Sequence, residues 1–181
     1  MRFTRVRIKN FRILEDVDVD LNQSLVFLNG NNGHGKTSFQ SAVAWCLYGE
    51  NQLPTLDDLA VGMVSEIQVE KNPSKGIFPF SVELDMDFTE QEQRVNLRRE
   101  VQWNVEKERA VPDSETFVVR VSSTDKSSST QVINPGDAWI EKWLPIRFKN
   151  YFLFDGEQMS EFFDSATRLA VEDAVKEIAQ V

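Results

Sequence analysis

The sequence contains very little cysteine and histidine. Its 181 residues include one cysteine, Cys46, and one histidine, His34. One cysteine excludes an internal disulfide and is consistent with a reducing compartment. One histidine leaves almost nothing for a histidine-based metal site or a catalytic triad.

Long apolar segments and an excess of basic charge are also absent. No apolar run is long enough to span a bilayer and the N-terminus lacks a signal-peptide pattern, which predicts a cytoplasmic protein with no membrane partner. The formal net charge of −9 argues against binding nucleic acid through the overall field, so any DNA contact needs a local patch. With 41% hydrophobic residues, the chain has the composition of a globular domain with a real core.

The segment from Gly30 to Thr37, GNNGHGKT, matches the phosphate-binding pattern G-x-x-x-x-G-K-[ST] at every fixed position. The apolar run 25–28 before it predicts a central strand buried on both faces, and the segment 36–48 after it predicts a helix that ends at Gly49. A strand, a glycine loop and a helix N-terminus together cradle the phosphates of a nucleotide. We therefore expect a nucleotide-binding protein, with ATP as the nucleotide.

The residue types of this loop suggest their roles. Gly30, Gly33 and Gly35 allow sharp turns that bring backbone N–H groups close to phosphate oxygens. Lys36 offers an ammonium group to the β- and γ-phosphates. The Thr37 hydroxyl is a hard oxygen ligand suited to Mg²⁺.

The first residues of the chain predict two half-buried strands. Apolar and basic residues alternate over 5–9, and apolar and aspartate residues alternate over 16–21. If the two strands pair, the basic face of one neutralises the acidic face of the other. We favour this structural interpretation, and a DNA-binding patch on the basic run stays open as the alternative.

Further along, residues 50–80 lack a sustained period and predict a loop-rich connection. Alternation then predicts an antiparallel meander with strands over residues 82–88, 94–103 and 117–121. Asn134 and Pro135 predict the N-cap and first position of a helix that stops before Pro145.

The segment 151–157, YFLFDGE, has two functional interpretations and one structural one. It could be a strand whose final Asp155 holds Mg²⁺ through water while Glu157 polarises the attacking water. It could be a loop at the lip of the nucleotide site whose carboxylates sense the γ-phosphate or the metal. It could also be an ordinary core strand that ends in a polar turn.

Three features in this order resemble the N-terminal half of SMC-like ATPase heads. They are the run Lys9 to Arg12, the loop GNNGHGKT and the helix ending in Trp45 to Gly49. These heads belong to the ABC-type ATPases of DNA repair and DNA processing, including SbcC and RecF relatives. Residues 152–157 look most like those of the DndD family, the ATPases of DNA phosphorothioation systems. The resemblance implies an α/β P-loop NTPase fold, the N-terminal lobe of an ABC/SMC-type head with an antiparallel meander.

The resemblance also implies site residues. The phosphate cradle would consist of Asn32, Gly33, His34, Gly35, Lys36, Thr37 and Ser38. Arg12 would lie near the phosphates or the base. Asp155 would occupy the Q-loop position, where many relatives carry a glutamine that contacts Mg²⁺ and the attacking water. Lys36 and Asp155 would then be the catalytic residues, and Thr37 and Asp155 would hold the metal.

The same resemblance implies a larger assembly. Residues 1–164 would form the N-terminal ATPase lobe, and 165–181 would begin a helix that leads toward a coiled coil. The family's signature motif and its second acidic strand are not found in this sequence. They would lie in a C-terminal lobe of the same protein, and two complete heads would pair around ATP on DNA together with DNA-processing proteins. The full protein would be an ATPase, and this chain alone would bind ATP with little turnover.

Two other classes remain. A self-contained P-loop kinase or small NTPase that acts on a small acceptor would have a mostly parallel sheet, with strands alternating with helices. The expected meander counts against it. A non-catalytic, nucleotide-gated interaction module is disfavoured by the combination of Lys36 and Thr37.

Overall fold

The computed structural model describes residues 1–31, 35–49, 76–88, 92–104, 109–111, 113–123, 130–149 and 153. The chain divides into two compact units, Met1–Ile140 and Glu141–Val181, which we describe separately. The first unit contains the sheet and helix α1 (Lys36–Tyr48). Helix α3 (Gly136–Trp143) crosses the boundary, and the 3₁₀ turn η4 (Ile146–Phe148) follows it.

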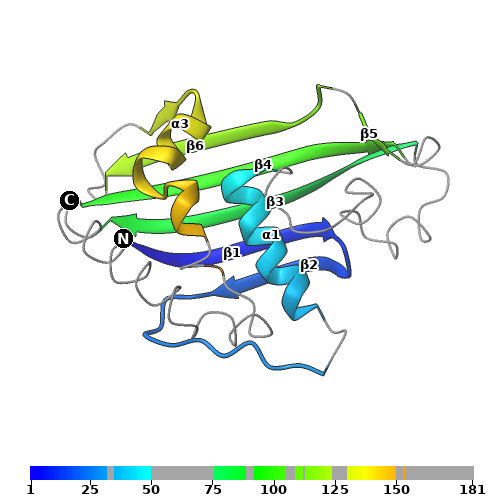
Figure 1. Cartoon of the computed structure of the whole chain (residues 1–181), viewed down its shortest axis with the longest axis horizontal. Coiled ribbons are helices and arrows are strands. Elements are labelled where there is room, and N and C mark those ends of the chain that lie inside the picture. The colour runs from blue at the N-terminus through cyan, green and yellow to red at the C-terminus, as the bar shows by residue number, and fades with distance from the viewer. Residues whose placement is uncertain are drawn as a thin grey trace. The chain divides into compact units, whose positions relative to one another are not determined.

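The first unit is built on one antiparallel sheet with the strand order β2–β1–β3–β4–β6–β7, and β5 pairs with β4 (Figure 1). The strands are β1 (Arg2–Phe11), β2 (Leu14–Asp20), β3 (Ile77–Phe88), β4 (Gln93–Asn104), β5 (Arg109–Ala110), β6 (Thr116–Ser123) and β7 (Gln131–Ile133). The predicted N-terminal strand pair and the predicted meander are therefore confirmed. All pairings between the described strands are antiparallel, which counts against the self-contained kinase alternative.

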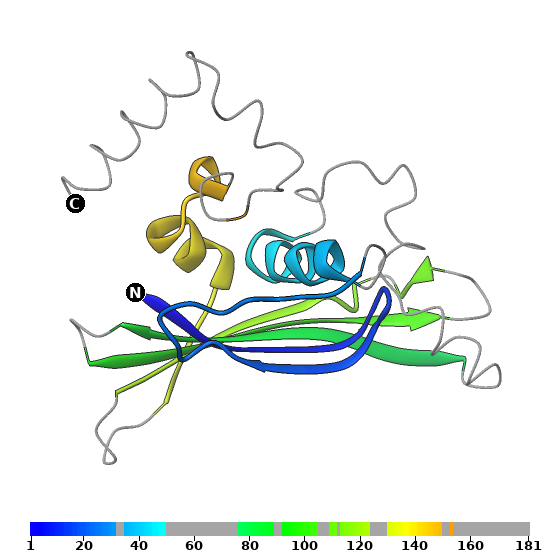
Figure 2. The same cartoon turned by 90° about the horizontal axis from the view of Figure 1, so that it is seen from below.

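Helix α1 lies on one face of the sheet, across β1, β3 and β4 (Figures 1 and 2). Its Trp45 is fully buried, with its ring centroid 5.8 Å from that of Phe11 and 5.2 Å from that of Phe80. Cys46 beside it is also buried, and burial raises the pKa of its thiol to about 12. A packed, unreactive thiol fits these surroundings.

The opposite face of the sheet is charged, and the sign of the charge alternates from strand to strand. Aspartates of β2 lie opposite basic residues of β1, which in turn lie opposite acidic residues of β3. Arg5 binds Asp18 at 2.5 Å, and Arg7 binds Glu83 at 2.7 Å and Asp85 at 2.9 Å. Arg5 and Arg7 of the basic run are therefore neutralised within the sheet, as the structural interpretation predicted.

The apolar run before the phosphate loop is not the predicted buried strand. Residues 25–28 form no strand, and Leu25, Phe27 and Leu28 are 68%, 82% and 44% exposed. Within the described residues this run has no neighbouring strand to pair with or pack against. An apolar run predicts that its side chains become buried, but it does not specify which element buries them.

Two predicted boundaries also need correction. The connection predicted over 50–80 gives way to β3 at Ile77, so Pro79 lies within a strand. Because β1 pairs with β3 only from Ser81 onward, the missing N–H of Pro79 costs no ladder hydrogen bond to β1. The Pro79 carbonyl accepts a hydrogen bond from Asn10 Nδ2 at 2.9 Å. Helix α3 begins at Gly136, one residue later than predicted.

Candidate functional site

The phosphate loop joins helix α1 at Gly35. This residue has a φ of 90°, in the left-handed region that glycine adopts without strain. A Cβ atom built at Gly35 would lie 2.9 Å from both Ile13 Cγ2 and Leu14 Cδ2. Glycine is thus needed here twice, once for the backbone conformation and once for the close approach of β2's first residue and the turn before it.

The first turn of α1 has features that suit an anion. Helix α1 has no side-chain N-cap hydrogen bond and no acidic residue in its first turn. The N–H of Phe39 donates to the Gly35 carbonyl at 2.8 Å, while Lys36 and Thr37 precede that first intrahelical bond and are exposed. Free N–H groups at the positive end of a helix dipole form an anion-binding site.

Lys36 closes the loop on itself. Its Nζ donates to the carbonyl of Gly30 at 2.5 Å and to that of Asn31 at 3.0 Å. An ammonium group has three N–H donors, and these two bonds to described residues leave a third for a phosphate oxygen. Lys36 can therefore hold the shape of the loop and contact a nucleotide at the same time. Asn32, Gly33 and His34, predicted to complete the cradle, lie outside the described residues.

The end of β1 and the β1–β2 turn, Asn10 to Ile13, pack against α1. Asn10 and Arg12 have positive φ values of 56° and 51°, a conformation that costs a non-glycine residue about 1–3 kcal/mol. Phe11 between them is fully buried against Trp45, which anchors the turn. Arg12 Nη1 donates to Ser41 Oγ of α1 at 3.2 Å.

Arg12 is half-buried in this position, and that burial lowers the pKa of its guanidinium. The structure thus brings Arg12 to the helix that carries Lys36, Thr37 and Ser38. Sequence reasoning missed Ser41 as the residue that holds Arg12. The signal was its spacing, because Ser41 lies four residues after Thr37 and therefore on the same face of the helix.

The donor set for a metal is small in the described part of the chain. Among those residues, no group of three or more His, Cys, Asp or Glu side chains is placed to hold a metal ion. The exposed Thr37 hydroxyl fits Mg²⁺, which usually takes few protein ligands and completes its shell with phosphates and water. Asp155 and Glu157 lie outside the described residues, and of their segment only Leu153 is described. Within the described residues, no helix is both long and apolar enough to cross a bilayer.

Comparison with known proteins gives one family match and several distant relatives. A family model described as an AAA domain matches residues 5–180. A DNA double-strand break repair Rad50 ATPase of Thermoplasma acidophilum is 23% identical over 153 residues, which are 84% of this chain and 14% of that protein.

Two further relatives match a shorter stretch at higher identity. A Rad50 ATPase of Halobacterium salinarum is 40% identical over 55 residues, which are 30% of this chain and 6% of the relative. A DNA replication and repair protein RecF of Pasteurella multocida is 41% identical over 51 residues, 28% of this chain and 14% of the relative. The matches therefore span only 6% to 14% of the length of these relatives.

Proposed function

The chain belongs to the AAA domain family, and on that basis we propose that it is the ATP-binding N-terminal lobe of an SMC-like ATPase head. Its relatives are ATPases and proteins of DNA repair, which supports an ATPase of that general kind. The observation that carries the proposal is the start of α1 at Gly35 to Thr37. This helix end has no side-chain cap, and the ammonium group of Lys36 binds the carbonyl of Gly30 in the loop. In the full protein, ATP binding and hydrolysis would be coupled to DNA processing.

In this proposal the cradle of Asn32 to Ser38 binds the phosphates of ATP, and Thr37 holds Mg²⁺. When bound, the metal would neutralise charge on the β- and γ-phosphates. The third N–H of Lys36 would contact a phosphate oxygen while the other two keep the loop closed. Arg12 would bring a second cation to the site from the β1–β2 turn. Asp155 would supply the further carboxylate at the Q-loop position.

The proposed lobe spans residues 1–164, with residues 165–181 beginning a helix toward a coiled coil. The exposed run of Leu25, Phe27 and Leu28 supports the proposal that a C-terminal lobe of the same protein packs there. That lobe would bring the signature motif and the second acidic strand. Two heads would pair around ATP, and the chain alone would turn over little ATP.

DNA sulfur modification is the specific pathway that we propose, and DNA restriction and DNA repair are the alternatives. Its support is the run at 152–157, which resembles that of the DndD family. The charge of −9 and the ion pairs of Arg5 and Arg7 support the proposal that DNA contacts lie in the rest of the assembly.

The test is Mg²⁺-ATP binding by the 181-residue chain, measured by isothermal titration calorimetry. A charge-assisted contact is worth about 1.5–3 kcal/mol, so Lys36→Ala should weaken ATP binding at least about tenfold. Lys9→Ala, on the charged face of β1, is the matched control and should bind like the wild type. Equal affinity of the wild type and Lys36→Ala would refute the cradle, and steady ATP hydrolysis by the chain alone would refute the half-head.

A further inference from the structure

Arg99 is a buried charge on the core face of β4. Its side chain is only 5% exposed, and it occupies an inward position between the buried residues Leu97 and Val101. A buried guanidinium needs partners, because desolvating an unpaired charge in the protein interior costs on the order of several kcal/mol. Its partners therefore indicate what Arg99 holds together.

One partner is the C-terminal end of helix α1. The last turn of α1 contains no basic residue, so the negative end of its dipole has no cation of its own. Arg99 Nε donates to the Cys46 carbonyl at 3.1 Å, while the N–H of Gly49 donates to the Trp45 carbonyl at 2.8 Å. Arg99, which lies on β4, thus caps the C-terminal end of α1, the helix that follows the phosphate loop.

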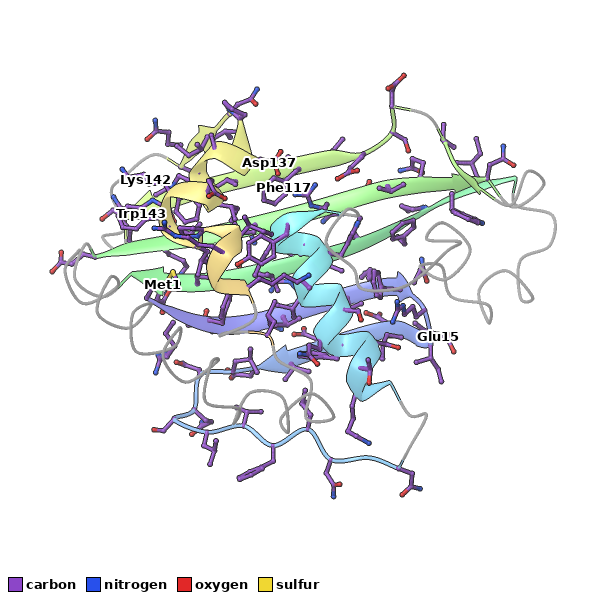
Figure 3. The ribbon with its side chains drawn as sticks, in the orientation of Figure 1. Met1, Glu15, Phe117, Asp137, Lys142 and Trp143 are labelled. Atoms are coloured by element: carbon purple, nitrogen blue, oxygen red, sulfur yellow. The ribbon has the colours of Figure 1, made fainter. Side chains whose placement is uncertain are left out.

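The other partners lie on β6 and α3. Arg99 Nη1 donates to Glu115, just before β6, and Nη2 donates to Asp137 of α3 at 2.9 Å. The guanidinium carbon lies 4.1 Å from the ring centroid of Phe117 on β6. Figure 3 labels Phe117 and Asp137, which lie near each other at the start of α3.

The same phenylalanine ring touches the start of α3. A Cβ atom on Gly136 would lie 2.8 Å from Phe117 Cδ1, so the helix begins in direct contact with that ring. A continuous row of contacts therefore runs from the first turn of α3 through Phe117 and Arg99 to the end of α1. Only a planar group with five N–H donors can stack on a ring and serve three acceptors at once.

We propose that Arg99 is a positioning residue that ties the end of the phosphate-loop helix to the first turn of α3. Ligand binding at the N-terminus of α1 then stabilises α3 through Arg99. This last step rests on the proposed nucleotide binding, whereas the tie itself does not. Because such coupling is reciprocal, loosening Arg99 also weakens nucleotide binding.

The experiment is hydrogen exchange of the amides of residues 140–143 in the 181-residue chain, because these N–H groups pair with the carbonyls of the first turn of α3. Without nucleotide, Arg99→Lys should speed that exchange about fivefold or more, the lower end of typical coupling between sites. Asp137→Asn is a milder second variant on a side chain that is 73% exposed, and it should speed exchange in the same direction without threatening the fold. Arg120→Lys, on the other face of the sheet, is the control and should leave exchange unchanged.

Saturating Mg²⁺-ATP should slow exchange over 140–143 in the wild type and in the control, and not in the Arg99 and Asp137 variants. Unchanged nucleotide-free exchange in both variants would overturn the tie. If calorimetry detects ATP binding and exchange over 140–143 does not respond in the wild type, the coupling is wrong. If the wild type binds no ATP, the proposed function fails, and the nucleotide-free comparison still decides the tie.

Discussion

Glu83 on β3 is the residue around which the charged sheet face is arranged. It accepts hydrogen bonds from Arg7 at 2.7 Å and Asn96 at 2.6 Å, and Arg98 lies 3.7 Å away. Partial burial opposes its ionisation, but the hydrogen bonds from Arg7 and Asn96 and the nearby positive charges outweigh that effect. The pKa of Glu83 is therefore lowered from its usual value of 4.5.

The pH dependence follows from the sign of this shift. A carboxylate whose pKa is lower in the folded chain stabilises the fold above its unfolded pKa, and that stability is lost as the pH falls through the folded pKa. We expect Glu83→Gln to lower the unfolding free energy at neutral pH by about 1 kcal/mol, the typical value of a hydrogen-bond contribution. When the pH is lowered below the usual pKa of 4.5, the thermal midpoint of Glu83→Gln should therefore decrease less than that of the wild type.

Thermal unfolding followed by circular dichroism between about pH 7 and about pH 3 measures this difference. Asp16→Asn is the control, because Asp16 lies on the same face, opposite Lys9 and away from Glu83. Parallel pH profiles for the wild type and Glu83→Gln would contradict the assigned role of Glu83.

Among the elements, helix α1 was the easiest to predict and the run before it the hardest. Glycines at positions 35 and 49 mark both ends of α1, and local backbone chemistry determines where a helix starts and stops. The run 25–28 has the composition of a buried strand, but its partner is a matter of tertiary structure that no local pattern specifies.

Sequence reasoning also passed over Arg99. The alternation along β4 that assigns the apolar Leu97 and Val101 to the core assigns Arg99 to it as well. An arginine at an apolar register position was the available signal. Its acceptors could not be predicted, because Cys46 and Asp137 are 53 and 38 residues away along the chain.

The junction of the phosphate loop, α1 and the β1–β2 turn allows a prediction at the element scale. Gly35→Ala would have to keep a φ of 90° and would place its Cβ 2.9 Å from Ile13 and Leu14. Backbone strain of this kind costs about 1–3 kcal/mol, so the unfolding free energy should fall by that amount. Chemical denaturation measures the loss.

Gly76→Ala is the control, since Gly76 directly precedes β3 and is not part of the loop junction. Its unfolding free energy should lie within about 0.5 kcal/mol of the wild type, as for most surface substitutions. Equal stability of Gly35→Ala and the wild type would mean that the turn does not press on the loop.

At the scale of the whole molecule, the exposed apolar run separates the chain's own stability from its association. Phe27 is 82% exposed, so it contributes little to the fold of the chain alone. The proposed C-terminal lobe would bury it, and full burial of a phenylalanine side chain is worth about 1.5–3 kcal/mol. Folding and association therefore depend on different residues of one chain.

We accordingly expect Phe27→Ser to change the unfolding free energy of the 181-residue chain by less than about 0.5 kcal/mol. The same substitution should weaken binding to the co-expressed C-terminal lobe at least about tenfold, because the buried area is lost only in that complex. Ile77→Ser is the control, since Ile77 is 54% exposed on β3 and should affect neither quantity strongly. Co-purification yield and thermal unfolding are measured on the same three proteins. If Phe27→Ser binds the lobe as well as the wild type does, this run is not the surface that the second lobe covers.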